Sequence, residues 1–268
     1  MSLLFQNCSK VDFSSAGNDN TTQGNGDDNT GAGPGDNNGN DTNCRFDTVS
    51  AAKQVKILFL IDTSGSNAGS LFKPGTDENK VWRLKTLNAF INKYGSKPNF
   101  SFGFAIFQGR DAVPLVESSG KGIFTNTKSE IDQAIVSFTN TPDTGNTPYD
   151  AALNELKEMI IYDQQLNPSK EVGYVLVMIS DGTPTNDSYV GSEGMSNMSK
   201  DVIDIMNIAP GQISLNTVYL FNNEIPTASE KSYLQKISEL GKGAFIEASS
   251  QQTLEISETI QVPTKNCQ

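Results

Sequence analysis

The chain is 268 residues long and 36% apolar, so it can bury a sizeable hydrophobic core. Its net charge of −11, without any cluster of Lys and Arg, argues against sequence-independent binding to nucleic acid or to anionic lipid. The sequence contains no His, which excludes His-dependent catalytic triads, Cys-His dyads and every zinc site that needs an imidazole.

The first eight residues end in a cysteine. MSLLFQNC is a short apolar stretch that leads to Cys8, and it resembles the end of a bacterial lipoprotein signal, although Phe5, Asn7 and the lack of a basic segment depart from that pattern. The resemblance implies that Cys8 is lipidated and that the protein is extracytoplasmic and membrane-anchored in a bacterium. No apolar run has the length of a membrane-spanning helix, so the anchor would be the lipid alone.

Residues 9–43 have the composition of a disordered tether. Asn, Gly, Asp and Thr recur there, and between Asp12 and Cys44 there is no Lys or Arg and hardly any apolar side chain. Such a segment cannot bury enough surface to offset the entropy of ordering. A calcium-binding repeat is the alternative, but no apolar residue recurs at a fixed period. We therefore expect a signal-like segment 1–8, a tether 9–43 and a folded domain 44–268.

Two further cysteines bracket the folded part. Cys44 directly precedes it, and Cys267 lies one residue from the end. Three free thiols would be ordinary in a reducing cytosol, but free cysteines are usually buried, and these lie in polar terminal stretches. We favour a disulfide between Cys44 and Cys267, which implies an oxidising compartment.

From residue 54 onward, short apolar runs alternate with helix-period segments. VKILFLID predicts a buried strand, and the amphipathic helix after it carries Val81, Leu84, Leu87 and Ile91 as apolar positions. Continuous apolar strands separated by helices predict an α/β fold, with a doubly wound, mostly parallel sheet covered on both faces and one short antiparallel edge strand. Further strands are expected at FSFGFAIF, AVPLV (a hairpin around Gly109 and Asp111), VGYVLVMIS, ISLNTVYLF and GAFIEA, and helices at 129–138, 148–161, 200–208, 229–240 and 251–261.

Polar side chains follow two of the buried strands. LFLIDTSGSN places Asp62, Ser64 and Ser66 after the first strand, and VMISDGTPTND places Asp181 after another. A third polar loop, NTPDTGNTPYDAAL, carries Thr147 just before a helix. Because ligands bind beyond the carboxyl ends of the strands in open α/β sheets, we expect these loops to meet at one site.

Together, the three loops resemble the metal-ion-dependent adhesion site (MIDAS) of the von Willebrand factor A (vWA) domain. The resemblance includes the order of strands and helices and covers about residues 54–262. It implies that the hydroxyls of Ser64, Ser66 and Thr147 bind a divalent ion directly. Asp62 and Asp181 would hold the ion through water, and a protein partner would offer it an Asp or Glu carboxylate. Thr144 and Thr141 remain alternatives to Thr147.

The residue types support a metal site independently. Hydroxyls, carboxylates and water form a hard oxygen shell suited to Mg²⁺, or to Mn²⁺ or Ca²⁺. Neutral direct ligands leave the charge of the ion poorly balanced, so it attracts an outside carboxylate. Each residue also has an ordinary alternative role: Asp62 and Ser64 as helix caps, Thr147 as the N-cap before Pro148, and Asp181 in a turn. The convergence of three loops favours the metal.

Two stretches are longer than the vWA pattern, residues 68–79 and residues 182–198. We expect both to overhang the metal and to select the partner, because binding residues concentrate on such loops. Solvated excursions without a role are the alternative.

An enzymatic function fits the sequence poorly. A haloacid-dehalogenase-like phosphatase needs a second carboxylate two residues after its nucleophilic Asp, where this chain has Ser64. An aspartic protease needs two Asp-Thr-Gly loops, and the three motifs hold no His or Lys to activate a serine. We therefore expect a monomeric, non-enzymatic, metal-dependent protein-binding domain of the adhesion type on a membrane tether. The alternative is an envelope scaffold or assembly subunit with a structural metal.

Overall fold

The computed structural model describes residues 44–46, 54–71, 73–168, 171–185, 188–222, 226–251 and 265–267. All of them belong to one compact unit, Asp41–Gln268. The predicted tether, the lipidation of Cys8 and nearly all of the helix expected at 251–261 fall outside the described residues. None of the helices in the described part of the chain is both long enough and apolar enough to cross a membrane.

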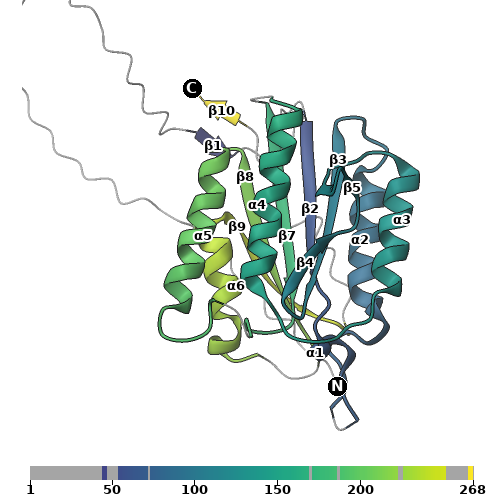
Figure 1. Ribbon diagram of the computed structural model, residues 1–268, viewed down its shortest axis with the longest axis vertical. Helices are drawn as coiled ribbons and strands as arrows, with labels where there is room; N and C mark the ends of the chain where they lie inside the picture. The colour runs from purple at the N-terminus through teal and green to yellow at the C-terminus, as the bar shows by residue number, and fades with distance from the viewer. Residues whose placement is uncertain are drawn as a thin grey trace, which may run out of the picture. The chain divides into compact units, whose positions relative to one another are not determined.

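A six-stranded sheet forms the centre of this unit (Figure 1). The strand order is β4-β3-β2-β7-β8-β9, and every neighbouring pair is parallel except the pair of β3 and β4. The antiparallel edge strand and the parallel majority confirm the predicted fold class. The strands are β2 (Gln54–Asp62), β3 (Phe100–Gln108), β4 (Asp111–Pro114), β7 (Val172–Ser180), β8 (Ile213–Phe221) and β9 (Lys242–Ser249).

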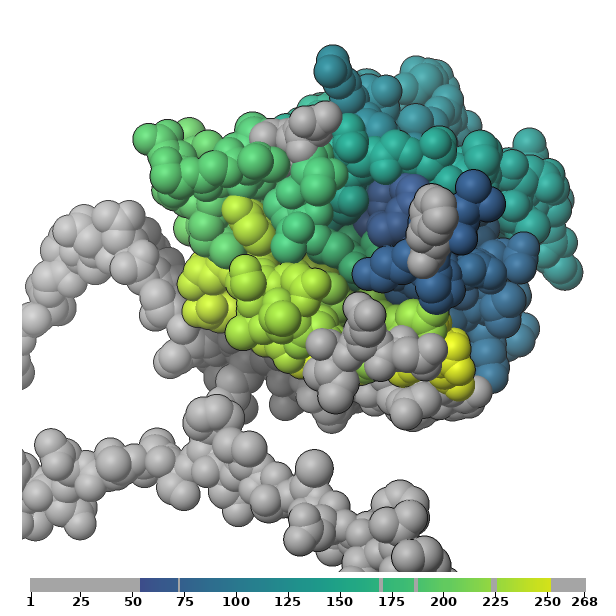
Figure 2. Space-filling model, turned by 90° about the horizontal axis from the view of Figure 1, so that it is seen from below, coloured from purple at the N-terminus to yellow at the C-terminus, as the bar shows by residue number. Residues whose placement is uncertain are grey.

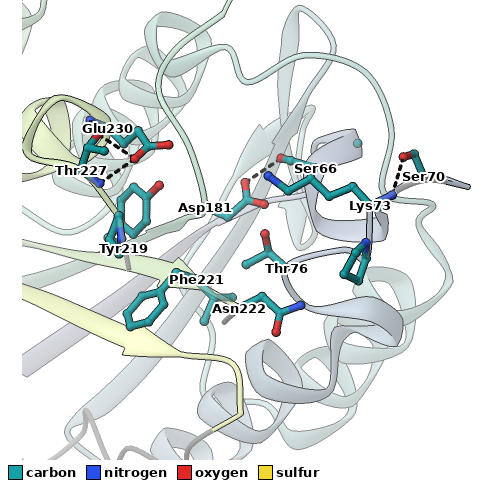
Figure 3. Close-up of a pocket in the computed structure, with 15 residues that line it drawn as sticks. Ser66, Ser70, Lys73, Thr76, Asp181, Tyr219, Phe221, Asn222, Thr227 and Glu230 are labelled. Carbon is teal, nitrogen blue, oxygen red and sulfur yellow. Dashed lines mark hydrogen bonds between the residues drawn. The ribbon is translucent and has the colours of Figure 1, made fainter. Parts of the chain in front are cut away.

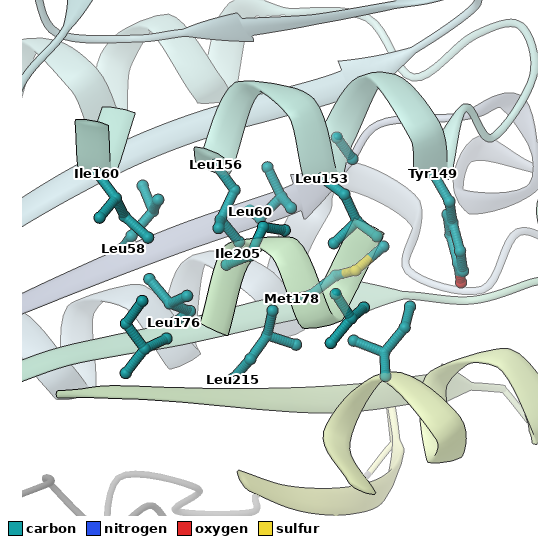
Figure 4. Close-up of a cluster of buried hydrophobic side chains, with 14 of the residues drawn as sticks. Leu58, Leu60, Tyr149, Leu153, Leu156, Ile160, Leu176, Met178, Ile205 and Leu215 are labelled. Carbon is teal, nitrogen blue, oxygen red and sulfur yellow. The ribbon is translucent and has the colours of Figure 1, made fainter. Parts of the chain in front are cut away.

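Helices cover both faces of the sheet, so the central strands are buried on both sides and need continuous apolar sequences. The helices α2 (Val81–Tyr94) and α3 (Lys128–Asn140) pack on one face. The helices α4 (Tyr149–Leu166), α5 (Gly194–Ile208) and α6 (Ala228–Leu240) pack on the other. In Figure 4, Leu153, Leu156 and Ile160 of α4 lie over Leu58 and Leu60 of β2.

The apolar face predicted for α2 was partly wrong. Leu87 is fully buried and Leu84 and Ile91 are half-buried, but Val81 is 65% exposed, and Trp82 and Phe90 fill the core instead. The helix begins at Val81, and the carboxylates of Asp77 and Asp143 bind the buried guanidinium of Arg83. Because Arg83 is held there, Trp82 and Arg83 face the interior and Val81 faces solvent. The start of α5 was misplaced as well: the helix begins at Gly194, well before the expected residue 200, whereas α4 begins at Tyr149, one residue from its expected start.

Three shorter pieces complete the described structure. A four-residue helix α1 (Gly65–Ala68) and a 3₁₀ turn η1 (Glu78–Lys80) connect β2 to α2. The strands β5 (Glu117–Ser118) and β6 (Lys121–Gly122) form a small hairpin.

The strand β1 (Cys44–Phe46) pairs antiparallel with β10 (Lys265–Cys267), and the register places Cys44 opposite Cys267. Residues directly opposite each other in an antiparallel pair have Cα atoms about 4.5 to 5.5 Å apart, a separation that a disulfide can span. The backbone pairing is therefore compatible with the predicted bridge, and the bridge itself stays a prediction.

Candidate metal centre

The site begins where two neighbouring parallel strands end. Asp62 is the last residue of β2, and Asp181 directly follows Ser180, the last residue of β7. Both carboxylates are buried, and the hydroxyl of Ser180 donates a hydrogen bond to Oδ2 of Asp62. The parallel pairing of β2 and β7 brings together two acidic residues that lie far apart in the sequence, as the strand pattern predicts.

The loop after β2 joins these carboxylates through its two serines. The backbone N–H of Ser64 donates to Oδ1 of Asp62 over 2.7 Å. The hydroxyls of Ser64 and Ser66 share a hydrogen bond of 3.1 Å, and the hydroxyl of Ser66 donates to Oδ1 of Asp181 over 2.7 Å (Figure 3). Four of the five predicted ligands thus form one hydrogen-bonded chain. Ser64 stands at the N-cap position of α1, but its hydroxyl makes no capping hydrogen bond and contacts the hydroxyl of Ser66 instead.

Backbone hydrogen bonds hold the second loop, residues 141–148, against the first. The N–H of Thr144 donates to Thr63 O over 2.8 Å, and the N–H of Gly65 donates to Gly145 O over 3.1 Å. Gly145 has a φ of +73°, a conformation that a residue with a Cβ rarely adopts, and an added Cβ would lie 3.0 Å from Gly109. Glycine at this position allows the second loop to approach the turn between β3 and β4 closely.

Thr147 lies between the second and third loops. Its N–H donates to Oγ1 of Thr185 over 2.9 Å, and the N–H of Thr185 donates back to Thr147 O over 3.0 Å. The structure places Pro148 at the N-cap of α4, so the capping role considered for Thr147 was wrong. Of its alternatives, Thr141 donates its hydroxyl to Ser137 O at the end of α3, and Thr144 is exposed. Thr147 therefore remains the candidate ligand from this loop.

The two buried carboxylates of the site, Asp62 and Asp181, favour the binding of a cation. Burial, together with the nearby charge of Asp181, raises the pKa of Asp62 to about 7. Burial also raises the pKa of Asp181, an effect that the nearby hydroxyls of Thr76 and Ser66 counter only in part. Oδ2 of Asp181 is buried and makes no hydrogen bond to any residue of the described part. A buried carboxylate oxygen without a donor, surrounded by hydroxyls, fits a hard divalent cation.

The site differs from a site built of many carboxylates. Among the described residues, no group of three or more Asp, Glu or Cys side chains gathers in a way that could hold a metal. The donors here are two carboxylates and several hydroxyls, which leave much of a divalent charge unbalanced.

A buried arginine behind the site connects its loops, and the sequence analysis did not identify it. Arg83 of α2 is fully buried, and its Nη1 donates to the backbone O of Asp62 over 2.5 Å. Its Nε donates to Asp77 over 3.0 Å and its Nη2 to Asp143 over 2.8 Å. Lys80 reaches the same Asp143 over 2.8 Å. Arg83 thus ties the end of β2 to the segment before α2 and to the second loop.

Asp77 also explains the start of α2. Its two carboxylate oxygens accept the N–H groups of Trp82 and Arg83 over 2.9 and 3.0 Å, which satisfies donors that a helix N-terminus leaves free. In the sequence, Arg83 resembles a solvent-facing residue of an amphipathic helix. Asp143 in the second loop was the one available hint of a buried partner.

The two insertions behave differently. Residues of the insertion 68–79 line a cavity together with Ser66 and Asp181, so this part does border the site. In the insertion 182–198, Tyr189 is buried and its hydroxyl donates to Asp201 over 2.7 Å. Residues 194–198 of that insertion are the first part of α5, so the stretch is not a continuous loop over the metal as expected.

Comparison with solved structures agrees with the fold. The D319A mutant of the PilB minor pilin from Streptococcus sanguinis aligns with a TM-score of 0.55 and 15% identity, over 80% of this chain and 61% of the pilin. A von Willebrand factor type A protein from Catenulispora acidiphila aligns with a TM-score of 0.51 and 15% identity, over 75% of this chain and 40% of that one. Proximal thread matrix protein 1 from the mussel byssus, with a zinc-occupied MIDAS motif, aligns with a TM-score of 0.52 and 14% identity, over 83% and 49%.

This chain therefore has the vWA fold, as its loops predicted. It spans 61% of the pilin chain and half or less of the other two, so the likeness concerns the fold alone. The sequence matches no protein-family model, and a comparison with curated proteins finds no relative.

Proposed function

We propose that this chain is a metal-dependent protein-binding domain, and that its centre holds a divalent cation which recruits an acidic residue of a protein partner. The hydrogen-bonded chain from Asp62 through Ser64 and Ser66 to Asp181 is the observation that carries the proposal. In this proposal these side chains serve to hold the cation, so the proposed function is binding and not catalysis.

In this proposal, Ser64, Ser66 and Thr147 are the direct protein ligands, and Asp62 and Asp181 act through water. The oxygen donors favour Mg²⁺, Mn²⁺ or Ca²⁺. The zinc in the MIDAS motif of the mussel protein supports a divalent cation as the class of ligand. When bound, the cation would supply a positive charge that an outside carboxylate can approach. Arg83 and the backbone bonds between the loops would keep the hydroxyls in place before the metal arrives.

We further propose that the domain is monomeric and works outside the cytoplasm of a bacterium, anchored by lipid on Cys8. The vWA-like minor pilin among the similar structures supports an extracytoplasmic setting, and a Cys44–Cys267 disulfide would require one.

Calorimetry with Mn²⁺ and Mg²⁺ tests the metal site. We expect wild type to bind one ion, and Asp181→Asn and Ser64→Ala to reduce the affinity at least ten-fold. Asp204→Asn makes the same chemical change on the exposed face of α5 and should have no effect. Equal affinity in Asp181→Asn and wild type would refute the site.

Capture from the native envelope, with and without chelator, then tests the recruitment of a partner. Partner binding that survives the chelator, while the metal still raises the melting temperature, would favour a scaffold with a structural metal.

A further inference from the structure

A cavity of about 630 Å³ adjoins the candidate metal centre (Figure 3). Ser66 and Asp181 of the candidate metal centre line the cavity together with Thr76 and other residues of the insertion 68–79. The end of β8 and the start of α6 line the remainder. This volume is in the range of sites that bind small molecules or peptide side chains. The other lining residues are Gly65, Gly69, Ser70, Lys73, Pro74, Tyr219, Leu220, Phe221, Asn222, Pro226, Thr227 and Glu230.

One wall is the insertion hairpin, residues 68–71 and 73–77, which is fixed by backbone contacts. The N–H of Thr76 donates to Ser66 O over 3.2 Å, and the amide of Asn222 on the facing wall donates to Gly75 O over 3.0 Å. A Cβ on Gly69 would lie 2.2 Å from the backbone of Gly75, so the two arms approach as closely as only glycines allow. The hairpin is therefore a preformed wall, and its placement depends on the same Ser66 that belongs to the metal centre.

The walls combine apolar surface with charges of both signs. Tyr219, Phe221 and Pro226 supply apolar surface, and Lys73 and Glu230 supply charges of both signs. Hydrogen bonds from Thr227 lower the pKa of Glu230, and the charge of Lys73 lowers it further, so Glu230 is ionised. An apolar body with a polar edge, as in Tyr or Trp, is the type of side chain that fits such a cavity.

The surface around the cavity extends this character. Leu71 at the tip of the insertion hairpin is 98% exposed. In Figure 2 the blue segment that contains this hairpin borders the yellow-green segment that contains the start of α6, on the face where the carboxyl ends of the strands lie. A partner that reaches the metal from this side meets the hairpin and the cavity together.

We propose that this cavity is a subsite for an aromatic side chain of the same partner whose carboxylate binds the metal. The proposal rests on the proposed function, because the partner is placed by its carboxylate. Ser66 and Asp181 belong to both the metal centre and the cavity, so the acidic residue and the aromatic residue of the partner would lie within a few residues of each other. Affinity would come from the metal, and selectivity from the cavity next to it.

Two small carboxylates test the subsite without knowledge of the natural partner. Acetate can reach only the metal, whereas 4-phenylbutyrate carries a phenyl ring that can enter the cavity. We expect the protein saturated with Mg²⁺ to bind 4-phenylbutyrate at least ten-fold more tightly than acetate in NMR titrations. Chelator should abolish the binding of both probes.

Variants of the cavity locate the ring. Ser70→Trp fills the cavity from the exposed rim, and Phe221→Ala removes part of its apolar wall. Each should reduce the preference for 4-phenylbutyrate over acetate to less than three-fold, while the affinities for acetate and for Mg²⁺ stay unchanged. Ser70→Ala loses the same hydroxyl and leaves the cavity open, so it should retain the full preference. The Trp variant changes only the rim, which keeps the test valid if Phe221→Ala is poorly folded.

The outcomes separate the two proposals. Equal affinity for acetate and 4-phenylbutyrate in metal-loaded protein would overturn the subsite and leave the metal-dependent function standing. A preference that persists unchanged in Ser70→Trp would also overturn the subsite, because the ring would then bind elsewhere. Failure of Mg²⁺ itself to bind would refute the proposed function, and phenylbutyrate binding that ignores chelator would refute the link between cavity and metal.

Discussion

The two ends of β2 differ in whether a buried carboxylate has a positively charged partner. Near its start, the buried ammonium of Lys56 contacts Oδ1 of Asp163, and the hydroxyl of Tyr174 donates to Oδ2 of the same carboxylate over 2.7 Å. At its end, the buried carboxylates of Asp62 and Asp181 accept hydrogen bonds from neutral serine groups. Burial without an opposite charge is costly. The compensated end therefore serves stability, and the uncompensated end is suited to bind a cation.

Arg83 makes the contrast sharper. It lies directly behind the uncompensated end, yet its charge is already balanced by Asp77 and Asp143. Its hydrogen bond to the carbonyl of Asp62 fixes the backbone and does not reach the carboxylate. The charge of Arg83 lowers the pKa of Asp181, but burial outweighs this effect, so the pKa of Asp181 is still raised.

The largest expected effect concerns the pairing of β1 with β10, which Figure 1 places away from α1, the helix next to the candidate metal centre. If Cys44 and Cys267 are bridged, closing a loop of over 200 residues stabilises the fold by about 5 kcal/mol on the chain-entropy model. Replacing both with Ser should lower the free energy of unfolding by that order and leave Mg²⁺ affinity unchanged. Denaturant titration and calorimetry measure the two quantities.

Cys8→Ser is the matched control for the disulfide and should not change stability. Free thiols at Cys44 and Cys267, found by non-reducing peptide mapping of protein from an oxidising compartment, would contradict the bridge.

Breaking the compensated end should cost almost as much. Lys56→Met leaves Asp163 buried without its cation, and removing one partner of a buried ion pair typically costs about 3 to 5 kcal/mol. Lys121→Met removes an exposed pair with Glu158 and should cost less than about 1 kcal/mol. If both variants lose the same stability in urea denaturation, the Lys56 pair is not an important source of stability.

The uncompensated end predicts a distinctive pH dependence in chelated protein. The pKa of Asp62 rises from 3.8 to about 7 on folding, so the folded state holds this proton more tightly than the unfolded chain does. This contribution is fully present below about pH 4 and is lost as the pH rises to about 7, a change of about 4 kcal/mol.

Asp62→Asn cannot titrate, so the stability difference between wild type and this variant should follow that curve. Thermal unfolding at a series of pH values measures it. Saturating Mg²⁺ should restore most of the stability that wild type loses as the pH rises, because the ion binds and stabilises the folded state. It should not change the stability of the variant. If the stability difference between wild type and Asp62→Asn is the same at pH 4 and pH 8, the titration of Asp62 is not the source of the pH dependence.

The smallest predicted effect concerns Thr76, whose hydroxyl lies next to Asp181 and counters the rise in its pKa. Thr76→Val keeps the shape and removes the hydroxyl, so it should weaken Mg²⁺ binding by about three- to ten-fold, the worth of one hydrogen bond. Thr76→Ser restores the hydroxyl and should restore the affinity. Equal affinity in all three proteins would place Thr76 outside the metal centre.

The sequence by itself determined the α/β class, the succession of strands and helices along the chain, and the three loops expected at the carboxyl edge. These follow from local patterns: continuous apolar runs predict buried parallel strands, and polar residues at their ends mark the edge of the sheet. Asp62, Ser64, Ser66 and Asp181 could be found in this way because they directly follow two strands.

Only the tertiary structure decided the burial of Arg83, the exposure of Val81 and the cavity beside the metal centre. Arg83 and Asp143 are 60 residues apart, and nothing in the period of α2 distinguishes an arginine bound to a buried carboxylate from one in solvent. The insertion hairpin was visible as extra length, but its role as a wall depends on glycine contacts between its arms and on the facing end of β8. The local sequence pattern determines the helices and strands. Contacts between residues far apart in the sequence determine which buried charges are balanced.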